Sequence, residues 1–114
     1  MLNQIVIVGR LVKDPVTIET NDGKKLANIT LAVQRNFKNS EGNYETDFID
    51  CVLWKGIAES TSNYCSKGSV LGIKGRLVTS VFKNNEGLSR KSVEVVAEKV
   101  SFIGNSNKDV STTE

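Results

Sequence analysis

The chain has 114 residues, of which 39% are hydrophobic and 25% charged, and its formal net charge is +2. This length fits one domain that can bury a core without metal or disulfide support. No stretch approaches the roughly 20 apolar residues of a membrane span, and the start has no signal-peptide pattern. We therefore expect a cytoplasmic protein without a membrane partner. The small positive charge permits a polyanionic partner without requiring one.

The cysteine and histidine content argues against metal and acid–base chemistry. The chain has two cysteines, Cys51 and Cys65, and no histidine. No common zinc site can be built from this set, and a histidine general base is missing. Each cysteine lies in an apolar run, which favours buried free thiols; a disulfide in an oxidising compartment is the alternative. We expect neither an enzyme nor a cofactor.

The N-terminal half is predicted to form β-strands separated by polar turns. Runs rich in Val, Ile, Leu and Thr favour the extended conformation, whereas segments of Asp, Asn, Gly and Pro favour turns. The predicted strands are 3–12, a short 16–20, 26–34 and 46–54. Asp22-Gly23 is a strong hairpin signal between two of them, and 38–43 is a polar loop.

The hydrophobic period changes after residue 56, which predicts a helix. One face of this helix would be formed by Ile57, Ala58, Thr61, Tyr64 and Cys65. Gly68 is expected at the C′ position that ends the helix, and Lys67 in its last turn, where a cation suits the macrodipole.

Two further strands, 69–81 and 89–102, are joined by the polar turn 84–87. Gly72 and Gly75 interrupt the first of them and mark a bulge or bend that a small barrel needs to close. Residues 104–114 are polar, which predicts a disordered tail. Strands, one helix and two more strands follow the order of an OB-fold. We predict an all-β, five-stranded Greek-key barrel over residues 1–103, with its helix between strands 3 and 4.

Aromatic residues beside cations are the strongest functional signal. A base can stack on an exposed ring while Lys or Arg neutralises phosphate, and each stack contributes ~1–3 kcal/mol. Such neighbours are Phe37 with Arg35 and Lys38, Trp54 with Lys55, and Phe82 with Lys83. Core packing is the alternative, especially for Phe48 and Trp54, which alternate within a strand. Tyr64 and Phe102 are assigned to packing, and Tyr44 fits either role.

Several segments, in this order, resemble the bacterial single-stranded DNA-binding (SSB) family. They are 1–15, with Met1-Leu2-Asn3-Gln4 and Gly9-Arg10-Leu11, then 27–33, 47–52, Lys67-Gly68-Ser69 and Gly75-Arg76-Leu77. The ordered set is specific and covers about residues 1–103. It implies an OB-fold protein, typically a homotetramer, that binds single-stranded DNA without sequence preference. The processes implied are replication, recombination, repair or DNA uptake.

The resemblance also implies which residues contact DNA. The stacking aromatics would be Phe37, Phe48, Trp54 and Phe82, and the phosphate contacts carried over are Arg10, Arg35, Lys55 and Arg76. The sequence itself adds Lys83, Arg90 and Lys91 on the last hairpin. The strand from Leu2 to Val8 resembles the segment that pairs protomers, which would remove an exposed sheet edge.

Two departures from the family pattern stand out. Ser80 occupies a position that is often basic, so one phosphate contact is expected to be missing. The chain stops at Glu114 without the acidic, Pro-Phe-type tip of the family, so tail-mediated recruitment of partner proteins is doubtful. Two rival hypotheses remain open: an OB module that docks a protein, and a cold-shock-like RNA binder.

Overall fold

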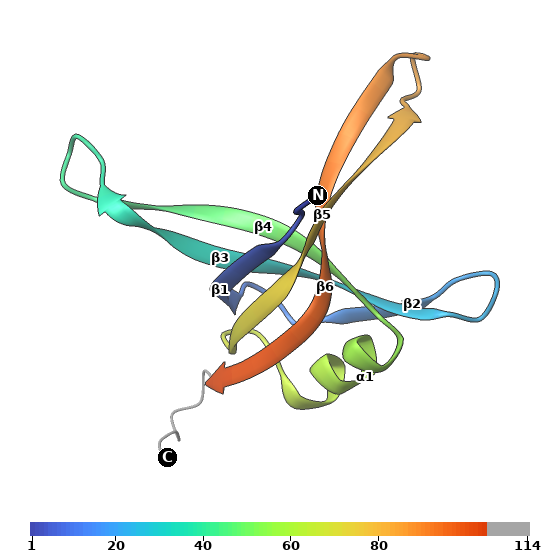
Figure 1. Ribbon diagram of the computed structural model, residues 1–114, viewed down its shortest axis with the longest axis horizontal. Helices are drawn as coiled ribbons and strands as arrows, with labels where there is room; N and C mark the ends of the chain where they lie inside the picture. The colour runs from blue at the N-terminus through green and yellow to red at the C-terminus, as the bar shows by residue number, and fades with distance from the viewer. Residues whose placement is uncertain (105–114) are drawn as a thin grey trace.

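The computed structural model describes residues 1–104 (Figure 1). Its elements are β1 (Ile5–Leu11), β2 (Val16–Glu19), β3 (Lys25–Lys38), β4 (Tyr44–Trp54), α1 (Lys55–Tyr64), β5 (Val70–Lys83) and β6 (Ser89–Gly104). The strand and turn predictions are confirmed, although β3, β4, β5 and β6 all extend further than expected. The predicted tail lies outside the described residues, except for Gly104, which ends β6. Within residues 1–104, α1 is too short to cross a membrane.

Five of the strands close into a barrel. β1 pairs with β5 along most of its length and with β3 at Arg10 and Leu11, and this second pairing closes the ring. β5 pairs with β6, β6 runs parallel to β4, and β4 pairs with β3. The short β2 pairs only with β3, so it lies outside the ring. The helix follows the third barrel strand, which confirms the predicted OB-fold.

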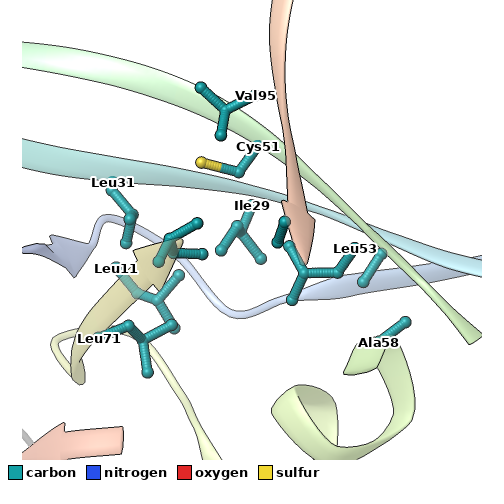
Figure 2. Packing of buried hydrophobic residues seen from close by; sticks show 11 residues of the cluster. Leu11, Ile29, Leu31, Cys51, Leu53, Ala58, Leu71 and Val95 are labelled. Carbon is teal, nitrogen blue, oxygen red and sulfur yellow. The ribbon is translucent and has the colours of Figure 1, made fainter. Parts of the chain in front are cut away.

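Alternate residues of these strands fill the barrel. The largest fully buried apolar side chains are Leu11, Ile29, Leu31, Leu53, Leu71 and Ile73. They form one cluster that includes Ala58 of α1, which lies below Leu53 at one end of the barrel (Figure 2). Period-two alternation of β3 therefore determines which of its side chains face inward.

The predicted bulge is found at Gly75, where glycine also permits a very close contact between strands. A Cβ there would lie 2.1 Å from the Val96 carbonyl oxygen. The pairing shifts at this point: Lys74 opposes Lys99, Gly75 opposes Ala97, and Glu98 is the extra residue of the bulge. Gly72 is different, because its nearest non-neighbour atom would be 3.4 Å away.

The end of the helix differs from the prediction. The helix ends at Tyr64, with Cys65 as its C-cap, so Gly68 is not at C′ and Lys67 lies beyond the last turn. The physical reason is the attachment of the following turn to β1: the Gly68 amide donates to the Leu11 carbonyl oxygen at 2.8 Å. Gly68 supplies the positive φ of 93° in that turn.

The assignment of Tyr64 and Phe102 to core packing is wrong. Tyr64 is 72% exposed and Phe102 is also exposed. Their ring centroids are 6.0 Å apart with an interplanar angle of 56°. The two rings therefore pack on each other at the surface, where Tyr64 is the last residue of α1 and Phe102 is near the end of β6.

Candidate nucleic-acid interface

Two long hairpins project from the barrel and carry most of the predicted site. We call residues 34–46 the β3–β4 arm and residues 78–94 the β5–β6 arm. Figure 1 shows them extending from the barrel in different directions, with β4 running between the first arm and α1. Phe37 is on the β3–β4 arm and Phe82 on the β5–β6 arm, while Phe48 and Trp54 lie on β4.

All four predicted stacking rings are open to solvent. Phe37 is 66% exposed, Phe48 67%, Phe82 51% and Trp54 36%. On β4, Phe48 and Trp54 lie on the face opposite to the buried Cys51 and Leu53. Val52 on the same face as the rings is buried, but both rings are exposed. These rings do not fill the core, and their faces are accessible to planar ligands.

Trp54 borders a shallow pocket with two lysines. The pocket is lined by Thr20, Asp22, Lys24, Trp54 and Lys55. Lys55 has a positive φ of 51° where the chain turns from β4 into α1, a conformation that is uncommon for residues other than glycine. The turn brings Lys55 beside the Trp54 indole, and the hairpin before β3 adds Lys24, whose ammonium group is 4.0 Å from the Asp22 carboxylate. Lys55 is therefore the cation better placed to meet the phosphate of a base stacked on Trp54.

The β5–β6 arm separates its cations between two faces. Phe82 is paired directly with Arg90, so these side chains share one face of the arm. Lys91 pairs with Val81, and Lys83 pairs with Ser89, which places both lysines on the opposite face. The structure thus brings Arg90, but not Lys83 or Lys91, to the Phe82 ring. Sequence proximity alone had associated Lys83 with Phe82.

Ser80, the departure from the family pattern, has a local partner. Its Oγ lies 2.9 Å from that of Ser92, directly across the β5–β6 arm. The hydroxyl pair lies on the same face as Phe82 and Arg90, because positions two apart on a strand share a face. The Ser80–Ser92 pair itself offers hydrogen-bonding groups without charge, between the Phe82–Arg90 pair and the Val78–Glu94 pair.

Three of the predicted phosphate contacts already have partners. Arg10 Nη1 donates to the Gly68 carbonyl oxygen at 2.7 Å, and Arg76 Nε is 3.6 Å from the Glu98 carboxylate. Arg35 makes the most contacts, with two carboxylates of β4. These ion pairs could have been predicted from the sequence. Once the loop 38–43 closes the hairpin, Arg35 lies opposite residues 45–47, which include both carboxylates.

The Arg35 contacts change the acidity of both partners. Arg35 Nε and Nη2 donate to Asp47 at 3.1 and 2.9 Å, and Nη1 donates to Glu45 at 2.9 Å. The hydrogen bond with Asp47 raises the pKa of Arg35, and the same bond lowers the pKa of Asp47 below its ordinary value of 3.8. Both groups therefore remain charged at neutral pH.

Tyr44, whose role the sequence left open, is exposed near the tip of the β3–β4 arm. Lys38 Nζ lies 5.7 Å from the centre of its ring and covers one of its faces. This distance is within the range of a cation–π contact. Tyr44 is therefore a surface ring that a cation partly covers.

The fold and this surface define a class of protein. The barrel is an OB-fold whose hairpins and outer strand present rings beside cations, the arrangement with which such folds bind single-stranded nucleic acid. Within residues 1–104 no group of His, Cys, Asp or Glu could hold a metal ion. Residues 2–103 match the model of the single-strand binding protein family. The chain belongs to this family, whose members bind single-stranded DNA and are not enzymes.

Curated relatives support the same family. The chain is 46% identical over 103 residues to single-stranded DNA-binding protein B of Bacillus subtilis, covering 90% of this chain and 91% of that protein. It is 48% identical over 103 residues to the single-stranded DNA-binding protein of Halalkalibacterium halodurans, with 90% and 61% covered. Single-stranded DNA-binding protein 2 of Listeria monocytogenes is 44% identical over 110 residues, with 96% and 69% covered. The chain thus spans nearly all of the first relative but only about three fifths of the second.

Proposed function

We propose that the chain binds single-stranded DNA without sequence preference by stacking bases on Phe37, Phe48, Trp54 and Phe82. The main support for this proposal is the exposure of the four rings on β4 and on the two arms. The family resemblance assigns base stacking to the same four residues. Every base has a π-face, so this contact tolerates any sequence. We assign the binding to residues 1–103.

Phosphate neutralisation would come first from cations that lack a partner. Within residues 1–104, Lys55, Lys83, Arg90 and Lys91 make no ion pair. Arg90 beside Phe82 and Lys55 beside Trp54 are placed to contact the phosphates of a stacked nucleotide. Arg10 and Arg76 keep donors free beyond their present contacts and would add weaker contacts.

Self-assembly through β1 is the second part of the proposal. Residues 5–9 of β1 pair with β5 on one edge only, because pairing with β3 is limited to Arg10 and Leu11. Leu2, Val6 and Val8 are exposed on this segment. An open strand edge with apolar side chains favours pairing with another strand. We propose that the Leu2 to Val8 segment pairs protomers into a homotetramer that acts in the cytoplasm, in replication, recombination, repair or DNA uptake.

The stacking proposal is tested by titrating the protein with oligo-dT and following fluorescence. Trp54 is the only tryptophan, so quenching on binding reports directly on that ring. Replacing Phe37, Phe48 or Phe82 with Ala should weaken binding by ~1–3 kcal/mol each, because a base–ring stack is lost.

Tyr64→Ala is the matched control, because Tyr64 is also an exposed ring but lies outside the proposed site. It should leave the affinity unchanged. A loss equal to that of Phe37→Ala, an unquenched Trp54, or equal affinity for duplex DNA would contradict the stacking model. Tighter binding of oligo-rU than of oligo-dT would favour the RNA-binding alternative.

A further inference from the structure

Each of the three guanidinium nitrogens of Arg35 donates a hydrogen bond to a neighbouring carboxylate. Arg35 Nε and Nη2 form a bidentate pair with Asp47, and Nη1 donates to Glu45. Glu45 also accepts a hydrogen bond from Asn39 Nδ2 at 3.3 Å. A single positive charge is therefore held between two carboxylates, so the cluster as a whole is negative.

This cluster lies where the β3–β4 arm is irregular. Gln34 pairs with Thr46, and the next pair is Lys38 with Tyr44. Between these pairs β3 has residues 35, 36 and 37, whereas β4 has only Glu45. Regular strand pairing therefore cannot orient Phe37, because the ladder is interrupted at its position. The Arg35 bridge crosses this interruption and ties the bulged segment to β4.

We propose that Arg35 is a positioning residue for Phe37 and that Glu45 and Asp47 keep its charge away from DNA phosphate. The proposal rests on the stacking role proposed for Phe37. The carboxylates act as an intramolecular competitor for the guanidinium, because carboxylate and phosphate both satisfy the same bidentate geometry. A phosphate that approaches Arg35 would compete with two hydrogen-bonded carboxylates for its guanidinium.

The affinity for single-stranded DNA is therefore lower than it would be if the Arg35 charge were available to phosphate. A surface ion pair adds little to the stability of the fold. Here the ion pairs instead determine which anion Arg35 contacts. Two consequences follow. Arg35 makes no contribution to the salt dependence of DNA binding in the wild-type protein, and removing both carboxylates makes one more cation available.

The charge part is tested by the salt dependence of oligo-dT binding. The double variant Glu45→Gln/Asp47→Asn should bind more tightly at low salt, and its log–log salt slope should be steeper by about 0.7, the value for one more charge on a single strand. The triple variant Arg35→Gln/Glu45→Gln/Asp47→Asn should have the wild-type slope. The difference between the two variants isolates Arg35 after its release from the carboxylates.

The opposite pattern would overturn this part of the proposal. If Arg35 already contacts phosphate, the triple variant loses about 0.7 from the slope and the double variant keeps the wild-type slope. Arg90→Gln is the control, because Arg90 has no ion pair within residues 1–104. It should lower the slope by about 0.7 in either case.

The positioning part is tested by a double-mutant cycle with Phe37. In the wild-type background, Phe37→Ala should weaken oligo-dT binding about tenfold. In the triple-variant background, the same substitution should weaken binding less than threefold, because a ring that Arg35 does not hold in place contributes less stacking energy. Circular dichroism confirms that each variant is folded.

The two proposals fail in different ways. An equal loss on Phe37→Ala in both backgrounds overturns the positioning role and leaves the stacking role intact. No loss in the wild-type background overturns stacking by Phe37, and the positioning role with it. The salt slopes decide the charge part independently of either result.

Discussion

Burial determines the chemistry of Cys51. Its side chain lies in the barrel next to Val95 (Figure 2). Burial, together with the nearby negative charge of Asp50, raises the pKa of the Cys51 thiol to about 12. Cys65 is half-buried, and burial raises its pKa as well. Both cysteines are free rather than joined in a disulfide, and Cys51 is buried as expected, whereas Cys65 is only half-buried.

We predict that Cys51 is inert in the folded protein. At pH 8 a Cys65→Ser variant should show no rapid reaction with a chromogenic thiol reagent until denaturant is added, because the thiolate is the reactive form and it is disfavoured in the core. The raised pKa of Cys51 also determines how the stability of the protein changes with pH. The contribution of Cys51 to stability is present below pH 9.0, the ordinary pKa, and is lost as the pH rises towards 12. Rapid reaction of the native variant would contradict the burial of Cys51.

At the scale of an element, the β5–β6 pair shows how a bulge allows a strand to bend around a barrel. β6 has the extra residue Glu98, and β5 has Gly75 at the same point. A side chain at Gly75 would press on the backbone of β6, because the nearest atoms are the Val96 carbonyl group and the Ala97 Cα. Backbone cannot move aside as a flexible side chain can.

We predict that Gly75→Ala destabilises the protein by about 1–3 kcal/mol or more, the range for overpacking. Urea denaturation measures the loss. Gly56→Ala is the matched control: Gly56 is in α1, and nothing lies within 4 Å of the added Cβ. This control should be neutral or slightly stabilising, since alanine has the higher helix propensity. Equal effects of the two substitutions would argue against the close strand contact.

At the scale of the whole molecule, one open strand edge of the barrel is lined by exposed apolar side chains. β1 has an open edge at residues 5–9, flanked by the exposed side chains of Val6 and Val8. Other barrel strands also have unpaired stretches, since β6 pairs with β4 only at Val95 and Val96. The position of the open edge is what supports assembly through β1 in the proposed function.

We predict that Val6→Glu shifts the protein from a multimer to a monomer, as measured by light scattering after size-exclusion chromatography. The introduced carboxylate faces Lys74 within its own chain, so the fold tolerates it, but two copies would bring like charges to one edge. Ile18→Glu on β2 is the control and should leave the mass unchanged, because β2 is outside the barrel ring. An unchanged mass for Val6→Glu would contradict assembly through β1.

Local signals in the sequence account for the fold and for the candidate site. The run 26–34, rich in Ile, Leu, Val and Thr, predicts β3, and Asp22-Gly23 predicts the hairpin before it. The change of period after residue 56 predicts the helix. These features depend on residues that are near one another in the chain, so the sequence by itself was sufficient. The site rings could be nominated as well, because a family resemblance aligns residues one by one.

Only the tertiary structure decided what depends on distant segments. Gly9 must be glycine because a Cβ there would lie 2.8 Å from the Ala32 carbonyl oxygen, where β1 crosses β3. The exposure of Tyr64 and the place of Gly68 follow from the attachment of the turn 66–69 to β1. Arg35 is bound by carboxylates rather than free, because hairpin closure brings β4 beside it. Each of these results depends on the distance between atoms far apart in the chain, which closure of the barrel and its hairpins determines.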